Sequence, residues 1–368
     1  MTERRVVKSL ADYHLLGRSG LRVSPFCLGT MTFGTEWGWG SAEDSARAIF
    51  DRYLEAGGNF IDTADGYTGG TSEQMLGRFI KDSKSRDRVV LATKFTFNQQ
   101  PGNPNAGGNG RKNIFRAIDA SLRRLQTDYI DLYWLHAWDM VTPIEEVMST
   151  LDALVRAGKV RHIGLSDTPA WYLAQAQTLA LLRGWDPVCA LQLEYSLVER
   201  NIEREHVPAA LHLGMGICPW SPLASGLLSG KYAGAEREKS AEGRLAKLKT
   251  SGNPAFEKLF TARNWAIADV LHAVAKELGR SAAQVALNWT TKRPAISSTI
   301  LGATKLGQLD DNLGALDFEI PAELSRRLEE AGRPELVFPY GFFKPEMQAM
   351  LRGGVPLRAE PKWFRGAE

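Results

Sequence analysis

The segment NFIDTADGYTGGTSEQMLGRFIKDSKSRDRVVLATK, residues 59–94, decides the fold of this chain. Its two ends, 59–63 and 89–94, are short apolar runs that predict buried strands, and the amphipathic stretch between them, from Thr71 to about Ile80, predicts a helix. Thr71 is followed three residues later by Gln74, which resembles a capping box at the start of this helix. A strand, a helix and a second strand in this order predict a βαβ unit with parallel strands.

The same alternation continues on both sides of this segment. Further strands are expected over 27–30, 129–136, 160–166, 188–195, 216–220 and 298–302, and further helices over 41–58, 113–126, 143–157, 169–182, 203–213, 262–278, 281–291 and 305–315. The strands are apolar at both odd and even positions, as strands buried on both faces should be. Eight such units predict an α/β fold, a (β/α)8 TIM barrel, with an open doubly wound sheet as the alternative. That alternative is weakened because no GxGxxG follows the first strand.

Residues outside the repeating units complete the expected organisation. Two short apolar stretches, 13–16 and 22–26, flank a glycine-bearing turn and predict an N-terminal β-hairpin that closes the base of the barrel. We expect one domain over residues 1–368, with the barrel core at about 13–330 and a C-terminal tail at 331–368. Two long segments, 97–112 and 224–260, lie outside the pattern, as functional lids or disordered loops do. The tail is rich in aromatic residues, which favours docking onto the body of the protein.

Composition narrows the classes of partner. The 368 residues are 44% hydrophobic and carry a net charge of only +3, without a dense run of Lys and Arg, so no nucleic-acid partner is expected. Cys27, Cys189 and Cys218 all lie in apolar segments and are expected to be buried, and their spacing predicts no metal site. Residues 1–10 lack the apolar core of a signal peptide, and no apolar run reaches the roughly 18 residues of a membrane span. We therefore expect a cytoplasmic protein with no membrane partner; the sequence leaves its oligomeric state open.

Polar side chains follow the predicted strands where a barrel of this type carries its chemistry. The C-terminal strand ends of such barrels form the active site, and here they present Asp62 with Tyr67 just after it, then Lys94, then His136. Taken singly, each residue has an ordinary alternative: a turn-capping aspartate, a solvated loop lysine, a hydrogen-bonded core histidine. Their placement together at one rim favours a catalytic site.

These four residue types suit the reduction of a carbonyl group, which needs a hydride at carbon and a proton at oxygen. A free tyrosine has a pKa of about 10, and a neighbouring ammonium lowers it by stabilising the phenolate. A carboxylate keeps the ammonium charged and oriented, and a neutral histidine can donate a hydrogen bond to the carbonyl oxygen. Since no side chain supplies hydride, a nicotinamide cofactor is expected.

The residues 59–67, together with 89–94, 130–136 and Gly164-Leu165-Ser166, resemble the aldo-keto reductase superfamily. The similarity is greatest to the branch that contains aryl-alcohol dehydrogenase-like reductases and the potassium channel β subunits, and it covers about residues 13–330. The resemblance implies that Tyr67 is the proton donor, that Lys94 and Asp62 tune it, and that His136 orients the carbonyl. It also implies NADPH as the cofactor.

The resemblance further implies a set of cofactor-binding residues. Thr30 belongs to this set. The nicotinamide end would be held by Ser166, Asp167, Gln192 and Trp220; the pyrophosphate by Ser221, Pro222, Leu223, Ser225, Gly226 and Lys231; and the adenosine end by Gly302, Thr304, Lys305, Gln308, Asp311 and Asn312. One position departs from the family, which usually has Asn where this chain has Asp167. The aspartate could act on the nicotinamide through its charge, or it could merely cap the helix that is expected to begin near Pro169.

The expected reaction is NADPH-dependent reduction of an aldehyde or ketone, a small-molecule carbonyl substrate, to the alcohol. Aromatic residues near the strand ends favour a bulky aromatic or alicyclic substrate: Trp37, Trp39, Phe95, Phe97, Trp138 and the aromatic tail. A second hypothesis is a redox-sensing accessory subunit that binds NADPH but turns over slowly. A third, a barrel hydrolase or an aldolase using Lys94 as a Schiff base, is disfavoured by the adjacent tyrosine and the dinucleotide-like segments.

Overall fold

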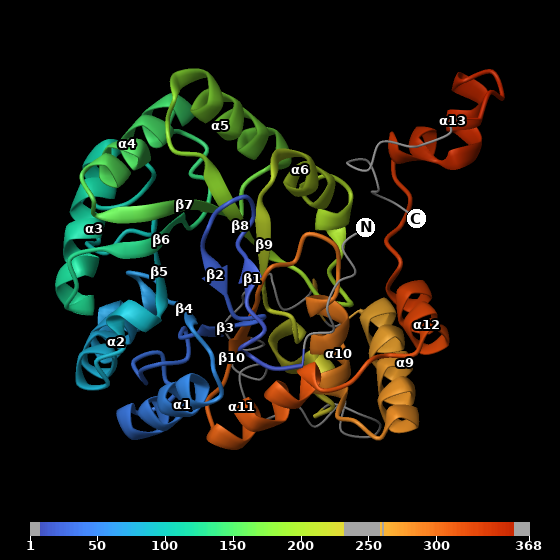
Figure 1. Cartoon of the computed structure of the whole chain (residues 1–368), viewed down its shortest axis with the longest axis horizontal. Helices are drawn as coiled ribbons and strands as arrows, with labels where there is room; N and C mark the ends of the chain where they lie inside the picture. Colours follow the sequence, from blue (N-terminus) through green and yellow to red (C-terminus); the bar gives the residue numbers. More distant parts are fainter. Residues whose placement is uncertain (1–7, 232–257, 260, 357–368) are drawn as a thin grey trace.

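Eight parallel strands form a closed barrel in the computed structural model, which describes residues 8–231, 258–259 and 261–356 (Figure 1). The strands follow one another in the order β10-β3-β4-β5-β6-β7-β8-β9, and every neighbouring pair is parallel. The first and last strands of this order, β10 and β9, close the barrel. Ile217 of β9 donates its N–H to the carbonyl of Ala295 at 2.8 Å and accepts from the N–H of Ser297 at 2.9 Å, just before β10 begins. The TIM-barrel prediction is confirmed, and the open-sheet alternative is wrong.

The elements lie close to their predicted positions. The barrel strands are β3 (Phe26–Gly29), β4 (Phe60–Asp62), β5 (Val90–Phe95), β6 (Ile130–Leu135), β7 (Val160–Ser166), β8 (Val188–Glu194), β9 (Gly216–Trp220) and β10 (Thr299–Gly302). The helices around them are α1 (Glu43–Glu55), α2 (Thr71–Asp82), α3 (Arg111–Leu125), α4 (Ile144–Arg156), α5 (Ala170–Arg183), α6 (His206–Leu213), α9 (Ala262–Leu278), α10 (Ala282–Thr291) and α11 (Leu306–Leu313). Two further helices, α12 (Ala322–Gly332) and α13 (Pro345–Leu351), were not predicted.

The helices from α1 to α12 cover the outside of the barrel, each with one apolar face. In α3, for example, the buried residues Ile114, Ala117, Ile118 and Leu125 recur at the three- and four-residue spacing of a helix face. These faces and the outward side chains of the strands form the main hydrophobic core. A second, smaller core fills the inside of the barrel.

The N-terminal hairpin contributes to this inner core. The strands β1 (His14–Leu15) and β2 (Arg22–Val23) pair antiparallel, as predicted. Leu16 and Val23 are fully buried in one cluster with residues that point into the barrel, such as Phe60 and Cys189. The hairpin therefore seals the base of the barrel and keeps the chemistry at the opposite end.

Glycine at position 164 allows a large side chain inside the barrel. A Cβ atom at Gly164 in β7 would lie 2.2 Å from the indole ring of Trp134, which projects from the neighbouring strand β6. Real Cβ atoms do not approach this closely, so any larger residue would displace the fully buried Trp134.

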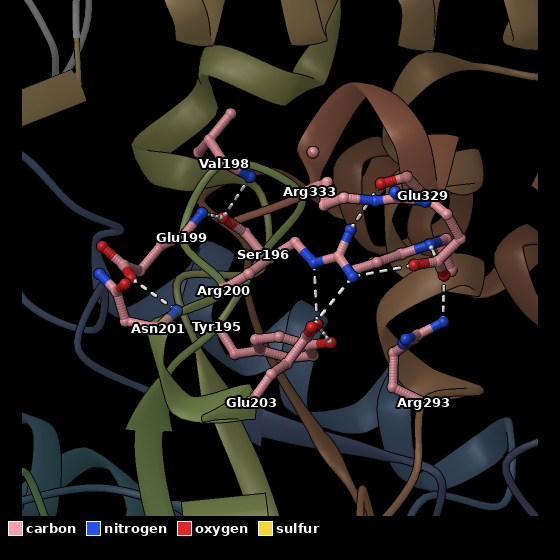
Figure 2. A network of polar contacts seen from close by, with 12 residues as sticks. Tyr195, Ser196, Val198, Glu199, Arg200, Asn201, Glu203, Arg293, Glu329 and Arg333 are labelled. Atoms are coloured by element: carbon pink, nitrogen blue, oxygen red, sulfur yellow. Dashed lines mark hydrogen bonds and ion pairs between the residues drawn. The ribbon is translucent and has the colours of Figure 1, made fainter. Parts of the chain in front are cut away.

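A network of charged side chains fastens α12 to the loop after β8 (Figure 2). Arg200, whose side chain is almost fully buried, pairs with Glu203 at 2.8 Å and with Glu329 of α12 at 2.8 Å. Glu203 also accepts from the Tyr195 hydroxyl at 2.6 Å, and Arg293 pairs with Glu329. The network ties the final helix of the barrel to the strand that carries Gln192.

Two local expectations were wrong. No side chain caps α2: its N-cap is Gly70, and Thr71 is already the first helical residue, so the Thr71–Gln74 pattern is no capping box. The aromatic tail does not dock as expected over its described part: Tyr340 donates to Glu205 at 2.5 Å, but α13 lies away from the barrel (Figure 1) and Phe338 is 86% exposed. Trp363, Phe364 and most of the long segment 224–260 lie outside the described residues, as do residues 1–7.

Among the described residues, no helix is both long and apolar enough to cross a membrane.

Candidate active site

One large pocket opens at the C-terminal ends of the barrel strands. Its volume is about 1490 Å³, and its floor includes the last residues of several strands, among them Gly29, Asp62, Ser166 and Gly302. Such a volume exceeds the range of about 300–1,000 Å³ that is usual for one drug-sized ligand. The pocket therefore has room for a dinucleotide and a second small molecule together.

A buried ion pair lies beneath the floor of this pocket. The Lys94 ammonium of β5 contacts the Asp62 carboxylate of β4, and both side chains are almost completely buried. The ammonium also donates to the carbonyl of Thr63 at 2.9 Å. The second oxygen of Asp62 accepts from Gln192 Nε2 at 3.0 Å, across the barrel. Burial alone would lower the pKa of Lys94, but the charge and hydrogen-bond interactions with Asp62 and Tyr67 together outweigh this effect and keep the ammonium charged.

Tyr67 reaches the ion pair from the loop after β4. Its hydroxyl lies 3.2 Å from the Lys94 ammonium. The loop turns sharply because Thr68, Gly69 and Gly70 all have left-handed backbone angles. Thr68 is held in this strained conformation because its hydroxyl donates to the carbonyl of Phe33 at 2.8 Å. The turn presents the Tyr67 ring to the pocket.

The pKa of Tyr67 is raised in the folded protein, whereas the sequence predicted that it would be lowered. Burial raises the pKa of the Tyr67 phenol above its ordinary value, and the Lys94 ammonium lowers it by a smaller amount. The lysine acts in the expected direction, but desolvation dominates because the surrounding pocket wall removes much of the phenol's contact with water.

His136 completes the group from the end of β6. Its ring lies edge-on to Tyr67 with 5.8 Å between the ring centroids. Burial, assisted by the Lys94 charge, holds the pKa of His136 well below its ordinary value. The imidazole is therefore neutral at pH 7 and can donate a hydrogen bond to an oxygen on which negative charge develops. The structure thus brings all four residues of the expected catalytic group together.

The wall beside this group is polar. Ser166 and Gln192 line it, and the buried Ser166 hydroxyl has no hydrogen-bond partner among the described residues, so it is available to a ligand. Asp167 has a left-handed φ of 45° and accepts a hydrogen bond from the Trp220 indole N–H at 3.0 Å. It does not cap α5, whose N-cap is Pro169 without a side-chain cap. The capping alternative is therefore wrong.

The pocket continues from Trp220 along the loops after β9 and β10. Ser221, Ala224, Ser225 and Gly226 all have positive φ, so this stretch folds back on itself beside the pocket. The structure places every residue expected at the cofactor along this one pocket: Thr30, Ser166, Asp167, Gln192, Trp220, Ser221, Pro222, Leu223, Ser225, Gly226, Lys231, Gly302, Thr304, Lys305, Gln308, Asp311 and Asn312.

These residues fit a dinucleotide. The far end of the pocket meets the N-terminus of α11, where Lys305 precedes the helix and backbone N–H groups favour an anion. Lys231, which also lines the pocket, adds a second cation. The partnerless Ser166 hydroxyl provides a polar contact at the end of β7, in the same pocket as Tyr67.

The residues expected at the substrate divide into two groups. Trp37 and Trp39 line the pocket, and Trp37 lies edge-on to Tyr67 at 6.3 Å between centroids. Phe95 is fully buried and stacks on Tyr133 in the core outside the barrel, and Trp138 packs against Trp171. Neither Phe95 nor Trp138 lines the pocket.

Sequence reasoning missed part of the pocket wall. Asn98 and Gln99 line the pocket next to Phe97, which lies edge-on to His136 at 4.8 Å between centroids. The signal for them was the length of the loop 97–112, which indicated a functional segment without indicating which of its polar residues face inward. Within the described part of the chain, no cluster of His, Cys, Asp and Glu is arranged to hold a metal ion.

Comparisons with known proteins agree with this geometry. The model of the Aldo/keto reductase family matches residues 25–333. The chain is 35% identical to an aryl-alcohol dehydrogenase from Pestalotiopsis microspora, over 94% of this chain and 88% of that protein. It is 36% identical to norsolorinic acid reductase from Emericella nidulans, over 95% and 89%, and 35% identical to an NADP(+) aryl-alcohol dehydrogenase from Phanerodontia chrysosporium, over 88% and 86%.

A further carboxyl group lies buried next to the site, two residues before Tyr67. Asp65 is only 2% exposed, and neither of its carboxyl oxygens has a hydrogen-bond partner among the described residues. Burial, assisted by the nearby Glu73 charge, raises the pKa of Asp65 to about 7, although Arg124 opposes this shift. The uncharged form of Asp65 is therefore the one that the fold favours.

We predict that Asp65 makes the protein less stable as the pH rises from about 4 to about 7. In this window the folded state holds a proton on Asp65 that the unfolded state has lost, so raising the pH favours unfolding. The Asp65→Asn variant removes this effect, and its stability relative to the wild type should increase across the window by roughly 3–4 kcal/mol at most. Denaturant unfolding at several pH values measures the difference; Asp128→Asn, at an exposed carboxyl, is the control. A difference that does not change with pH would contradict the assignment.

Proposed function

Since the chain belongs to the aldo/keto reductase family, we propose that it catalyses the NADPH-dependent reduction of an aldehyde or ketone to the alcohol. The observation that carries this proposal is the convergence of Asp62, Tyr67, Lys94 and His136 at one end of a dinucleotide-sized pocket. The proposed active unit is the whole chain acting as one domain.

Each of the four residues has a distinct task in this reaction. Tyr67 gives its phenolic proton to the carbonyl oxygen as the bond order of the carbonyl falls. Lys94, 3.2 Å away, stabilises the phenolate that remains. The neutral His136 stabilises the negative charge developing on the oxygen. A bound NADPH would supply the hydride.

The proposed cofactor site uses the polar residues along the pocket. Ser166, Asp167 and Gln192 would hold the carboxamide, and Trp220 would lie against the nicotinamide ring. The turn from Ser221 through Lys231 would follow the pyrophosphate, and the residues from Gly302 to Asn312, including Lys305, would hold the adenosine end. The partnerless Ser166 hydroxyl and the two lysines support this orientation.

The substrate is proposed to be a bulky aromatic or alicyclic carbonyl compound. Trp37, Trp39 and Phe97 present apolar ring surface to the pocket around Tyr67 and His136. Trp37 and Phe97 remain 42% and 54% exposed, so a flat apolar ligand would cover ring surface that water now contacts. The relatives named as aryl-alcohol dehydrogenases support the aromatic class.

The direct test is steady-state turnover with NADPH against a panel of aliphatic, alicyclic and aromatic aldehydes and ketones. We expect turnover in the ordinary range of enzymes, about 1–10³ s⁻¹, for the best aromatic or alicyclic substrate. Tight NADPH binding with very slow oxidation by every carbonyl would instead indicate the redox-sensing accessory subunit. Absence of NADPH binding would refute the proposal.

We predict that Tyr67→Phe lowers kcat by about 10²–10⁴, the range for loss of a positioned general acid. The affinity for NADPH should change little, because the lost hydroxyl acts on the substrate and the aromatic ring is retained. Stopped-flow turnover and a fluorescence titration of NADPH measure the two quantities on the same preparation. Full activity in this variant would show that the proton comes from another group.

We also predict a preference for NADPH over NADH that depends on Lys305. Lys305 lines the pocket at the start of α11, in the proposed position for the 2′-phosphate. A charge-assisted contact contributes about 1.5–3 kcal/mol, so Lys305→Ala should weaken NADPH binding about tenfold or more. NADH binding to the same variant is the internal control and should be unaffected. Equal weakening of both cofactors would refute this role.

A further inference from the structure

Asp167 is a carboxyl group in the wall of the pocket, beside the proposed place of the nicotinamide ring. It is held there by the Trp220 indole, which donates to its Oδ1 at 3.0 Å. Its backbone carbonyl accepts from the N–H of Trp138 at 3.4 Å, and its N–H donates to the carbonyl of Gln192 at 3.1 Å. Asp167 is thus fixed on both sides, in a left-handed conformation that Asn and Asp tolerate better than other non-glycine residues.

We propose that Asp167 distinguishes the two oxidation states of the cofactor: its carboxylate favours the positively charged oxidised nicotinamide, and protonation of Asp167 removes this preference. The inference rests on the proposed function, because it needs the nicotinamide ring next to Trp220. Its physical basis is the charge difference between the two forms. The oxidised ring carries a positive charge that the reduced ring lacks, while the phosphates of both forms are the same.

The charged groups around Asp167 set the pH at which this preference is lost. Asp167 keeps solvent-exposed surface, but partial desolvation by the surrounding pocket wall still raises its pKa to about 6, and the indole N–H of Trp220 opposes this rise. Glu194, at the end of β8, raises the pKa further, whereas the ammonium groups of Lys94 and Lys258 lower it. Asp167 in turn raises the pKa of Tyr67, so the two groups lie close enough to interact electrostatically.

This arrangement favours carbonyl reduction at neutral pH. Hydride transfer from a bound NADPH, with Tyr67 giving its proton to the carbonyl oxygen, would leave a positively charged nicotinamide ring beside Asp167. An ionised Asp167 stabilises that state of the complex and slows the release of the oxidised cofactor. As the pH falls and Asp167 gains a proton, this stabilisation is lost, and the balance shifts toward the reduced cofactor.

Calorimetric titration of NADP+ and NADPH into the wild type and Asp167→Asn, from about pH 5 to about pH 8, tests the proposal without any turnover. In the wild type, the ratio of the NADP+ to the NADPH dissociation constant should rise about fivefold or more as the pH falls, as expected for a partly screened charge pair. In Asp167→Asn the ratio should be independent of pH and equal to the low-pH ratio of the wild type. The cofactor phosphates also titrate in this range, but they are the same in both forms, so their effect on the two dissociation constants cancels in the ratio.

Variants at two residues next to Asp167 identify the titrating group. They should move the midpoint of the pH dependence of the dissociation-constant ratio in opposite directions. Trp220→Phe keeps an aromatic ring but removes the indole donor to Asp167, so the midpoint should move to higher pH. Glu194→Gln removes a carboxylate that raises the pKa of Asp167, so the midpoint should move to lower pH. Because both variants retain Asp167, they test the proposal even if Asp167→Asn does not fold.

The outcomes separate this inference from the proposed function. If both cofactor forms bind the wild type with a ratio that does not change with pH, Asp167 has no such role, while the reductase proposal stands. A pH-dependent ratio that persists in Asp167→Asn would assign it to another group. If neither form binds, the proposed function itself fails.

Discussion

The buried contact between Lys94 and Asp62 is the constraint on which the rest of the site depends. Each charge alone would be very costly in an interior that water does not reach, and removing either partner would leave the other uncompensated. Further polar contacts come from the Thr63 carbonyl and the Tyr67 hydroxyl, which lie near Asp62 in the chain, and from Gln192 of β8, which lies far from it. Gln192 reaches Asp62 across the barrel because the sheet is closed, so closure of the barrel supports the ion pair. The hairpin at the base contributes by filling the interior below the pair with apolar side chains.

The repeating part of the structure could be predicted because it follows from local periodicity. Alternating apolar strands and amphipathic helices predicted the eight units, and the rule that barrel chemistry lies at the strand ends brought Asp62, Lys94 and His136 together. The same periodicity, applied more strictly, would have excluded Phe95. Successive residues in a strand point to opposite faces, so with Lys94 inside the barrel its neighbour must point outward. Phe95 does so and stacks on Tyr133 at 5.0 Å between centroids.

What the sequence could not reveal is set by contacts between distant segments. Trp220 donates to Asp167 across 53 residues and Gln192 donates to Asp62 across 130, and no local pattern encodes either pair. The tail shows the converse. Its aromatic content indicated docking, but apolar composition alone does not specify a surface to cover, and Phe338 and Met350 are exposed. Helix α12, just before the tail, packs Leu328 into the main core and also pairs Glu329 with Arg200, a contact that depends on the folded position of both segments.

Three carboxyl groups near Tyr67 show how one barrel rim creates different electrostatic environments. Asp62 has an ammonium partner, Asp167 has an indole donor, and Asp65 has no hydrogen-bond partner among the described residues. Backbone strain gathers at the same rim, where Thr68, Asp167, Ser221, Ala224 and Ser225 all adopt positive φ. Unpaired buried groups and strained residues both reduce stability. They persist because the two apolar cores, one inside the barrel and one beneath its helices, hold the strand ends in place. The rim can therefore be shaped for binding and proton transfer rather than for stability. The apolar cores stabilise the fold, and the strained, partly unpaired rim residues form the site.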